Sequence, residues 1–424
     1  MLAACVFLCG PGHTAAQDAT LQTAELAPVN TINIHGPGRT RHAVITRAAG
    51  LAPNPVLTPA GFERALRRLS DLPVASRTRM EYAVVDGATK VDVFVVEHRV
   101  APSGWRAFSA IGARAILLDE ARVHVAGPFG SGELMSAAWR WSANRPKVAL
   151  GLAMPSPHFF AGIVSFDVLW ERQSYGVAPS AEAVTLLRDE RRRVGLHAGD
   201  WSSGWLHWQA GAALDRMRAQ GALPSQPLTT RDYLATDGTL AVRPAGDRLA
   251  LEATGSWWTP FTGTGHVATS GLLGAWRSSS DTTAPSWFTT SEITVANRIA
   301  PLSLWPGAGT GEGRSGLLRA HRLLHSGVLT GPVFGRTVAY TSLEHARPVA
   351  RTRAGVLMLS GFVDTARAWR RLGNLDTTPL FVDAGVGLRL QGDGPGGGVR
   401  VNVAHGLRGG GATISASWDR AWPR

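Results

Sequence analysis

The stretch FVDAGVGLRL, residues 381–390, alternates strictly between two kinds of side chain. One set is apolar: Val382, Ala384, Val386, Leu388 and Leu390. The other set is Asp383, Gly385, Gly387 and Arg389. Strict period-two alternation predicts a β-strand whose two faces meet different surroundings. In a soluble sandwich the apolar face packs on a second sheet, whereas in a membrane barrel it meets lipid and the polar face lines the lumen.

The same alternation recurs in both directions from this stretch. Residues 399–404 and 412–418 repeat it, with valine, alanine, isoleucine and tryptophan on one face. We count about ten strand candidates between residues 111 and 300 and about five from residue 335 onward. A single-chain bacterial barrel has an even number of strands. We therefore expect one more strand, either within 101–118 or near 175–190.

Composition favours the membrane barrel over the soluble sandwich. Only 17% of the residues are charged, mean hydropathy is close to zero, and 15 Trp accompany 4 Tyr. No stretch approaches the roughly 20 apolar residues of a membrane-spanning helix. A barrel distributes its hydrophobicity over alternating positions, and Trp is enriched at membrane–water interfaces. We expect an all-β transmembrane barrel of about 16 antiparallel strands.

Residues 1–16 resemble a secretory signal peptide. The apolar run Leu2–Cys9 is followed by Thr14-Ala15-Ala16, whose small side chains suit a cleavage site. A basic segment ahead of the run is missing, so we expect the true start to lie upstream. A lipoprotein signal ending at Cys5 is the alternative, but Cys5 follows too short an apolar segment. After a linker, 17–27, the exported chain has no cysteine for a disulfide or a thiolate metal site.

The chain carries a formal net charge of +12, mostly from arginine. A strongly basic protein is a candidate for binding nucleic acid. Here the arginines are spread over predicted strands and turns rather than gathered on one helix, and an export signal also argues against that partner. Arginines lining a barrel lumen account for the charge equally well, so we expect no nucleic-acid partner.

Residues 28–98 predict a small α+β domain ahead of the barrel. The expected order is strand, helix, helix, strand and strand, at 29–34, 40–49, 60–72, 77–85 and 90–96. Thr58-Pro59 provides an N-cap and a proline at the first position of the second helix. Asp86-Gly87 is a dipeptide typical of the turn between two hairpin strands.

This order resembles a POTRA domain, and the sequence flow ITRAAGL…LTPAGFERALRRLSDLP…VDGATKVDVFVVEHR is similar to that family. The resemblance implies a periplasmic domain that receives polypeptides by strand addition to an exposed sheet edge. The strand at 77–85 is the expected edge, because the strand at 90–96 is more apolar and hence more central. The residues expected to meet a client there are Arg77, Arg79, Met80 and Tyr82.

Residues 301–334 are the one long segment without a strand pattern in the expected barrel, 103–424. Their GRSGLLRAHRLLHSG is followed by FGRTVAYTSLEHARP and then by VLMLSGFVDTARAW. This succession resembles the bacterial surface antigen (D15) barrel of the Omp85 superfamily, which includes BamA, TamA and the two-partner-secretion transporters. The resemblance implies an extracellular loop that folds into the lumen through an Arg-Gly-aromatic motif.

The family's functional residues carry over at four positions. Arg319 takes the place of the motif arginine, and Glu344 that of an inward acid on the following strand. Phe362 and Asp364 match a Phe-x-Asp motif. Strand parity independently turns both acids inward, where an arginine fork can bind a carboxylate through two hydrogen bonds.

Alternatives to this anchor remain open at the sequence level. Each acid could instead pair with another lumen arginine, such as Arg336 or Arg389. We expect an anchor to be needed because a long loop that gains little from packing loses entropy on ordering. Ala320 and His321 depart from the motif's Gly-aromatic pair, so the loop tip is expected to sit differently.

The C-terminus also departs from the family pattern. The chain ends Trp422-Pro423-Arg424 rather than on phenylalanine. We expect Trp418 or Trp422 to serve as the terminal aromatic signal of the barrel.

Catalytic motifs are weak in this sequence. Residues 307–311 resemble a phosphate-binding loop but lack its Lys-Ser/Thr, and no βαβ unit surrounds them. His197, Asp200 and His207 lie near one another in the sequence, yet no pair of histidines has the i, i+4 spacing of a helical metal site. No nucleophile elbow is present. We expect a protein that is not an enzyme and that needs no metal or cofactor.

The resemblance implies two functions from different classes. The first is translocation of polypeptides across the Gram-negative outer membrane, or their insertion into it, with the POTRA domain in the periplasm. The expected partners are outer-membrane lipid, a client polypeptide bound by strand addition, and other assembly proteins. The alternative is a pore-forming or structural surface barrel without a client. A single POTRA domain favours a narrow task.

Overall fold

The computed structural model describes residues 28–419 apart from short gaps. The gaps are 101–110, 113–114, 117–118, 158–159, 181–182, 222–229, 245–246, 280, 282–283, 312–313, 315, 353–354, 372–376 and 392–397. The expected signal peptide, 1–16, the linker, 17–27, and Trp422 lie outside the described residues.

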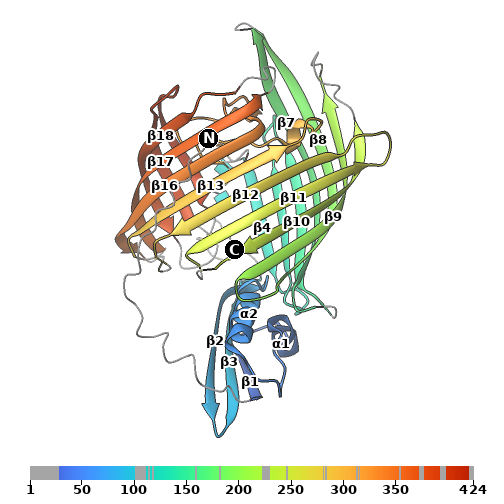
Figure 1. The fold of residues 1–424 in the computed structure, drawn as a ribbon, viewed down its shortest axis with the longest axis vertical. Helices are drawn as coiled ribbons and strands as arrows, with labels where there is room; N and C mark the ends of the chain where they lie inside the picture. The colour runs from blue at the N-terminus through green and yellow to red at the C-terminus, as the bar shows by residue number, and fades with distance from the viewer. Residues whose placement is uncertain are drawn as a thin grey trace.

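The N-terminal module, residues 28–98, is a three-stranded sheet with two helices on one face (Figure 1). Its elements are β1 (Val29–His35), α1 (His42–Ala49), α2 (Pro59–Ser70), β2 (Ala75–Val85) and β3 (Ala88–Glu97). Thr58 caps α2 by accepting the Gly61 N–H at 3.1 Å, as expected from Thr58-Pro59. The strand order β1-β3-β2 places β2 at an edge, which confirms the edge predicted for residues 77–85.

The remainder of the chain forms one closed barrel, in which consecutive strands pair in antiparallel register. Its first ten strands are β4 (Glu120–Ala126), β5 (Leu134–Arg140), β6 (Lys147–Pro155), β7 (Ile163–Ser180), β8 (Ala183–Trp201), β9 (Leu206–Gln220), β10 (Arg231–Val242), β11 (Leu249–Pro260), β12 (Val267–Arg277) and β13 (Ser286–Ala296). The last five are β16 (Gly335–Thr352), β17 (Gly355–Arg371), β18 (Phe381–Gln391), β19 (Gly398–Gly406) and β20 (Ala412–Asp419).

Two further strands of the same sheet, β14 (Leu324–His325) and β15 (Val328–Leu329), have two residues each and belong to segment 301–334. β13 therefore pairs directly with β16 across that segment. The 17 strands of this sheet among the described residues agree with the expected barrel of about 16. The described residues near 175–190 form no extra strand, because 175–180 extend β7 and 183–190 extend β8 into a long hairpin. Most of 101–118 lies outside the described residues.

The barrel wall has the predicted two faces. On β18, Val386 and Leu388 are 56% and 48% exposed, whereas Asp383 is fully buried. The apolar set therefore points away from the barrel and the polar set into it, as a lipid-facing wall requires. The helices among the described residues are short, and none has the length and apolarity that a helical membrane crossing requires.

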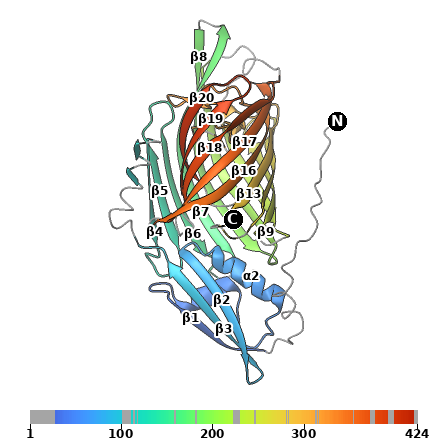
Figure 2. The same cartoon turned by 90° about the vertical axis from the view of Figure 1, so that its left-hand side faces the viewer.

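The two ends of the barrel differ. The N-terminal module lies at one end, with α2 next to the strand turns (Figures 1 and 2). The β7–β8 hairpin projects at the opposite end (Figure 2). Segment 301–334 fills the lumen between the walls, where inward side chains of β7 to β13 pack against it. Core members shared by wall and segment include Tyr175, Met217, Trp258, Trp305, Leu323, Leu329 and Phe334.

Candidate functional site

Segment 301–334 follows β13 and turns back into the lumen. It begins with a 3-10 turn, η1 (Leu302–Leu304), and reaches a tight turn at Arg319-Ala320. Leu318 and Leu323 on either side of that turn are fully buried. The expectation that this loop gains little from packing is wrong, because its apolar side chains form a core with the wall. Hydrophobic burial and the polar anchor therefore both offset the entropy that the segment loses on ordering.

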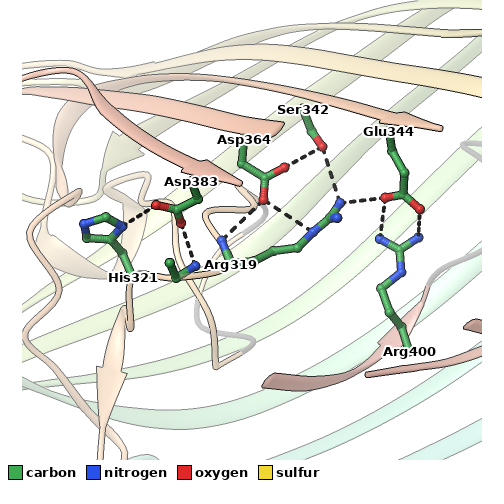
Figure 3. A network of polar contacts seen from close by, with 8 residues as sticks. Arg319, His321, Ser342, Glu344, Asp364, Asp383 and Arg400 are labelled. Carbon is green, nitrogen blue, oxygen red and sulfur yellow. Dashed lines mark hydrogen bonds and ion pairs between the residues drawn. The ribbon is translucent and has the colours of Figure 1, made fainter. Parts of the chain in front are cut away.

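Arg319 occupies the predicted position between the two predicted acids (Figure 3). Its Nη2 donates to Glu344 Oε2 at 2.8 Å, and its Nε lies 3.4 Å from Asp364 Oδ2. Asp364 also accepts from Ser342 Oγ at 2.7 Å, through Oδ1, and from the Arg319 N–H at 3.3 Å, through Oδ2. The Arg319 guanidinium carbon lies 3.8 Å from the ring centroid of Phe362, a close cation–π contact. The structure thus brings all four predicted anchor residues together.

A second arginine, which the sequence did not assign, shares this site. Arg400 donates to Glu344 from Nη1 at 3.0 Å and from Nη2 at 3.1 Å. Glu344 therefore bridges two guanidinium groups, one from the segment and one from β19. Arg336, an alternative partner considered above, instead lies 5.1 Å from the ring centroid of Trp305.

A third carboxylate, Asp383 on β18, fastens the tip of the segment. It accepts the Ala320 N–H at 2.6 Å through Oδ2, and His321 Nδ1 lies 2.8 Å from its Oδ1 (Figure 3). The His321 ring packs edge-on against Phe381 at 4.7 Å. Thr413 Oγ1 donates to the Ala320 carbonyl at 3.1 Å. His321, which departs from the aromatic residue of the family motif, therefore makes a ring contact with Phe381 and a polar contact with Asp383.

The same segment is held on the opposite wall by backbone contacts. β15 pairs in parallel with β7, with Val328 opposite Ser174. Side chains of the wall donate to segment carbonyls: Gln173 to Gly327 at 2.9 Å, Asn144 to Ser326 at 2.9 Å and Arg145 to Gly311 at 3.0 Å. Segment 301–334 therefore bridges the lumen from β7 to the β16–β19 wall.

The second candidate site is the β2 edge of the N-terminal module. Arg77 and Arg79 are exposed, as a contact surface for another chain requires. Met80 is only 5% exposed and belongs to the module core, and Tyr82 packs edge-on against Phe62 at 5.2 Å. The side chains of Met80 and Tyr82 thus support the edge from inside, while its backbone and the arginines face outward.

Glu97, at the end of β3, fixes the connection between β1 and α1. It accepts the Thr40 N–H at 2.8 Å, and Arg39 Nε lies 3.2 Å from its Oε2. Burial raises the pKa of the Glu97 carboxyl, but the hydrogen bonds from Thr40 and the charge of Arg39 outweigh burial and hold that pKa below its usual range. The same connection contacts the barrel, where the Arg41 N–H donates to the Gly130 carbonyl at 3.2 Å.

Helix α2 docks the module on the turns at the near end of the barrel. Arg68 forms two parallel hydrogen bonds to Asp200, of 2.7 and 2.6 Å. Arg67 Nη1 donates to Asp247 at 2.6 Å, and Arg67 Nε donates to the Gly204 carbonyl at 3.1 Å. Bidentate, charge-assisted bonds of this kind are among the stronger polar contacts in proteins. We name these contacts the α2 clasp.

Trp201 lies at the centre of the α2 clasp. The indole is 2% exposed and donates from Nε1 to Asp71, the C-cap residue of α2, at 2.5 Å. The guanidinium carbons of Arg67 and Arg243 each lie 5.3 Å from its ring centroid. One side chain from the barrel is therefore enclosed by charged groups from the module and the wall.

The three residues that suggested a catalytic or metal site do not converge. His197 on β8 faces Asp167 on β7 and Asp237 on β10, at 3.3 and 3.4 Å. Asp200 is engaged in the α2 clasp, and His207 packs against Trp201 at 5.1 Å. Within the described part of the chain, no group of three or more His, Cys, Asp or Glu is arranged to hold a metal ion.

The expected terminal aromatic signal is described only in part. Trp418 lies in β20, opposite Val399 in the register with β19. Its role as a signal stays a prediction.

Comparison with known proteins gives matches at the level of structure. The sequence matches no protein-family model and none of the curated proteins. BamA from Haemophilus ducreyi lacking POTRA domains 1–3 superposes with a TM-score of 0.54 at 13% identity, over 92% of this chain and 84% of that one. CdiB from Acinetobacter baumannii gives 0.54 at 12% identity, over 93% and 72%. CdiB from Escherichia coli gives 0.51 at 12% identity, over 97% and 91%.

These structures are similar to both parts of the chain, the α+β module and the barrel that follows it. The fold expected from the sequence is confirmed: this chain is a β-barrel preceded by a small α+β module, and it shares that fold with the BamA and CdiB structures.

Proposed function

We propose that this protein moves client polypeptides across the Gram-negative outer membrane or inserts them into it. The N-terminal module is then a periplasmic POTRA domain that receives the client at β2. The observation that carries the proposal is an open sheet edge held at the mouth of the barrel by the α2 clasp. An extended client paired with β2 lies next to the barrel that must accept it.

The fold comparisons support this proposal through their shared architecture. The BamA structure is described as lacking POTRA domains 1–3, so POTRA domains belong to that protein, and this is the domain type we propose for residues 28–98. The lipid-facing band of the wall supports a membrane location, and the module end then faces the periplasm.

A passive pore without a client is the alternative from the sequence. Segment 301–334 packs across the lumen with a buried apolar core, which favours a barrel that is closed at rest. A closed barrel with an accessible receiving edge suits regulated passage of a polypeptide better than steady diffusion of solutes.

The proposal is tested by comparing outer-membrane and secreted proteins in cells with and without the gene. We expect one or a few proteins to be lost from these fractions in its absence and restored by the intact protein. A copy lacking residues 28–98 should not restore them, provided that its barrel shows heat-modifiable mobility on gels. Unchanged outer-membrane and secreted fractions would contradict the proposal.

A further inference from the structure

The outward face of the barrel changes from apolar to charged along one line on four adjacent strands. Val168, Val194, Leu214 and Leu234 are direct register partners on β7, β8, β9 and β10. Leu214 is 57% exposed and Val194 44%, so this row faces lipid. The α2 clasp at Asp200 marks the opposite end of β8, and the row therefore lies toward the far end of the barrel.

The positions beyond this apolar row are strongly basic. The first row farther from the module consists of the register partners Trp170, Arg192, Arg216 and Asp232. The second row consists of Arg172, Glu190 and Arg218. Arg188 follows on β8. Adjacent positions are about 5 Å apart across strands and about 7 Å apart along a strand. We name this surface the arginine rows.

The arginine rows carry more positive charge than their own carboxylates neutralise. Five arginines face two acids. Glu190 pairs with Arg192 at 2.8 Å and with Arg172 at 3.5 Å, and Asp232 pairs with Arg216 at 2.7 Å. Arg188 and Arg218 are exposed and have no acidic partner among the described residues.

The position of this charge identifies the chemistry of a ligand. A guanidinium fork matches the oxygens of a phosphate group, and a cluster of basic residues beside a lipid-facing band attracts anionic headgroups. Trp170 adds an interfacial aromatic, with the Arg172 guanidinium carbon 5.8 Å from its ring centroid. A lipid whose phosphate groups lie at the arginine rows and whose acyl chains run along the apolar row contacts both surfaces at once.

We propose that the arginine rows bind the phosphate groups of lipid A, the phosphorylated glycolipid of the leaflet away from the N-terminal module. The inference rests on the outer-membrane location proposed above and is independent of any client. Acyl chains lie along Val194 and Leu214, and the phosphates are held by the arginines of the first two rows and Arg188. Such a site fixes the β7–β10 wall at one height in the membrane.

The test uses the full-length protein in detergent micelles with bisphosphorylated lipid A as the probe. The fraction of protein carrying lipid is measured by native mass spectrometry across a lipid titration. The test variant Arg188→Gln/Arg218→Gln removes two guanidinium groups that pair with no acid among the described residues, so the barrel should fold. We expect lipid A to bind about 30-fold more weakly to it, which corresponds to about 2 kcal/mol for two arginines.

The matched control is Arg347→Gln/Arg351→Gln, which removes the same charge from exposed positions at the module end. We expect the control variant to bind bisphosphorylated lipid A as tightly as the unchanged protein does. We expect lipid A without its phosphates to bind the unchanged protein and the test variant equally weakly. Equal loss in the control would show a net-charge effect and overturn the proposal. Binding of the stripped lipid to the unchanged protein as tightly as that of bisphosphorylated lipid A would overturn it as well. None of these outcomes bears on client transport.

Discussion

A single guanidinium group links segment 301–334 to two strands. Arg319 contacts Glu344 on β16 and Asp364 on β17, and the site is almost fully buried. Removal of one member of a buried pair leaves an uncompensated charge, which costs about 3–5 kcal/mol. Glu344 keeps Arg400 in the absence of Arg319, whereas Asp364 keeps only the Ser342 hydroxyl and backbone contacts.

We therefore expect Arg319→Ala and Asp364→Ala each to lower the free energy of unfolding by about 3–5 kcal/mol, with the double variant little worse than either. The measurement is urea-induced unfolding of the barrel in lipid vesicles. Arg314→Ala, elsewhere in the segment, is the comparison, since Arg314 donates to the Trp305 and Leu302 carbonyls of the segment itself. Additive effects of Arg319 and Asp364 would contradict the contact between them.

Adjacent residues on β11 test the two faces of the wall. Ala253 points outward between Leu240 and Leu272, and Leu272 is 60% exposed. Thr254 points into the lumen. We expect Ala253→Arg to destabilise the barrel by about 2–4 kcal/mol near mid-bilayer and Thr254→Arg to have little effect. Equal losses in an unfolding titration would show that these faces are assigned wrongly.

The polar contacts that anchor segment 301–334 could be predicted only in part from the sequence. The motif positions gave Arg319, Glu344 and Asp364, and parity turned Asp383 and Arg400 inward. Their partners depend on the register between strands far apart in the chain, which alternation within one strand does not fix. The contact of Asp383 with Ala320 and His321 arises where the chain departs from the family motif, so the motif gave no signal for it.

Among the elements, β2 of the N-terminal module has the most direct consequence for function. One of its edges pairs with β3 and the other pairs with no strand in the described part of the chain. Unpaired edges accept an additional strand. The only cysteines in the sequence are Cys5 and Cys9, within the expected signal peptide, so an introduced thiol is unique in the exported protein.

We expect client polypeptides to crosslink to Arg79→Cys and to Arg77→Cys in living cells. Thr31→Cys, exposed on β1 at the opposite edge of the sheet, is the control and should give little crosslinking. Mass spectrometry of the adducts identifies the clients, which should be the proteins lost when the gene is deleted. Stronger crosslinking from Thr31→Cys would assign the receiving edge to β1.

Individual helices and strands could be predicted from the sequence because their periodicity is a property of neighbouring residues. The N-cap at Thr58-Pro59 and the turn at Asp86-Gly87 marked elements that the structure contains. The length of the β7–β8 hairpin was missed, since its residues beyond the lipid band are charged and lack a clean alternation. A strand that leaves the membrane no longer needs one apolar face.

For the whole molecule, the α2 clasp is a main link between module and barrel. Arg68 meets Asp200 at the end of β8, and Arg67 meets Asp247 between β10 and β11. Both pairs lie at the domain boundary. Asp247 also has two arginines of the barrel near it, Arg243 at 3.7 Å and Arg277 at 3.9 Å. Together with the hydrogen bond from Arg41 to Gly130 and the packing of Ala126 and Leu134 against the module core, the clasp orients the β2 edge relative to the lumen.

We expect Arg67→Ala/Arg68→Ala to free the module without unfolding it. Spin labels at Val84→Cys and Val349→Cys, both exposed, report the distance between module and barrel. The distribution should be narrow in the clasped protein and broad in the variant. Arg64→Ala is the control on the same helix, because Arg64 makes a long contact of 3.4 Å to the Ser202 carbonyl and no ion pair with the described residues of the barrel. A narrow distribution in all three proteins would show that other contacts hold the module.

The crossing of the lumen by segment 301–334 has a mechanical consequence. Its two fastenings are unequal, since the β16–β19 side uses buried ion pairs and the β7 side uses short backbone pairing and hydrogen bonds to carbonyls. Under the proposed function a polypeptide that passes through the barrel displaces this segment, and we expect the β7 side to detach first. We then expect the contacts of Arg319 and Asp383 to keep the segment attached to the β16–β19 wall, so that it returns to its place after passage.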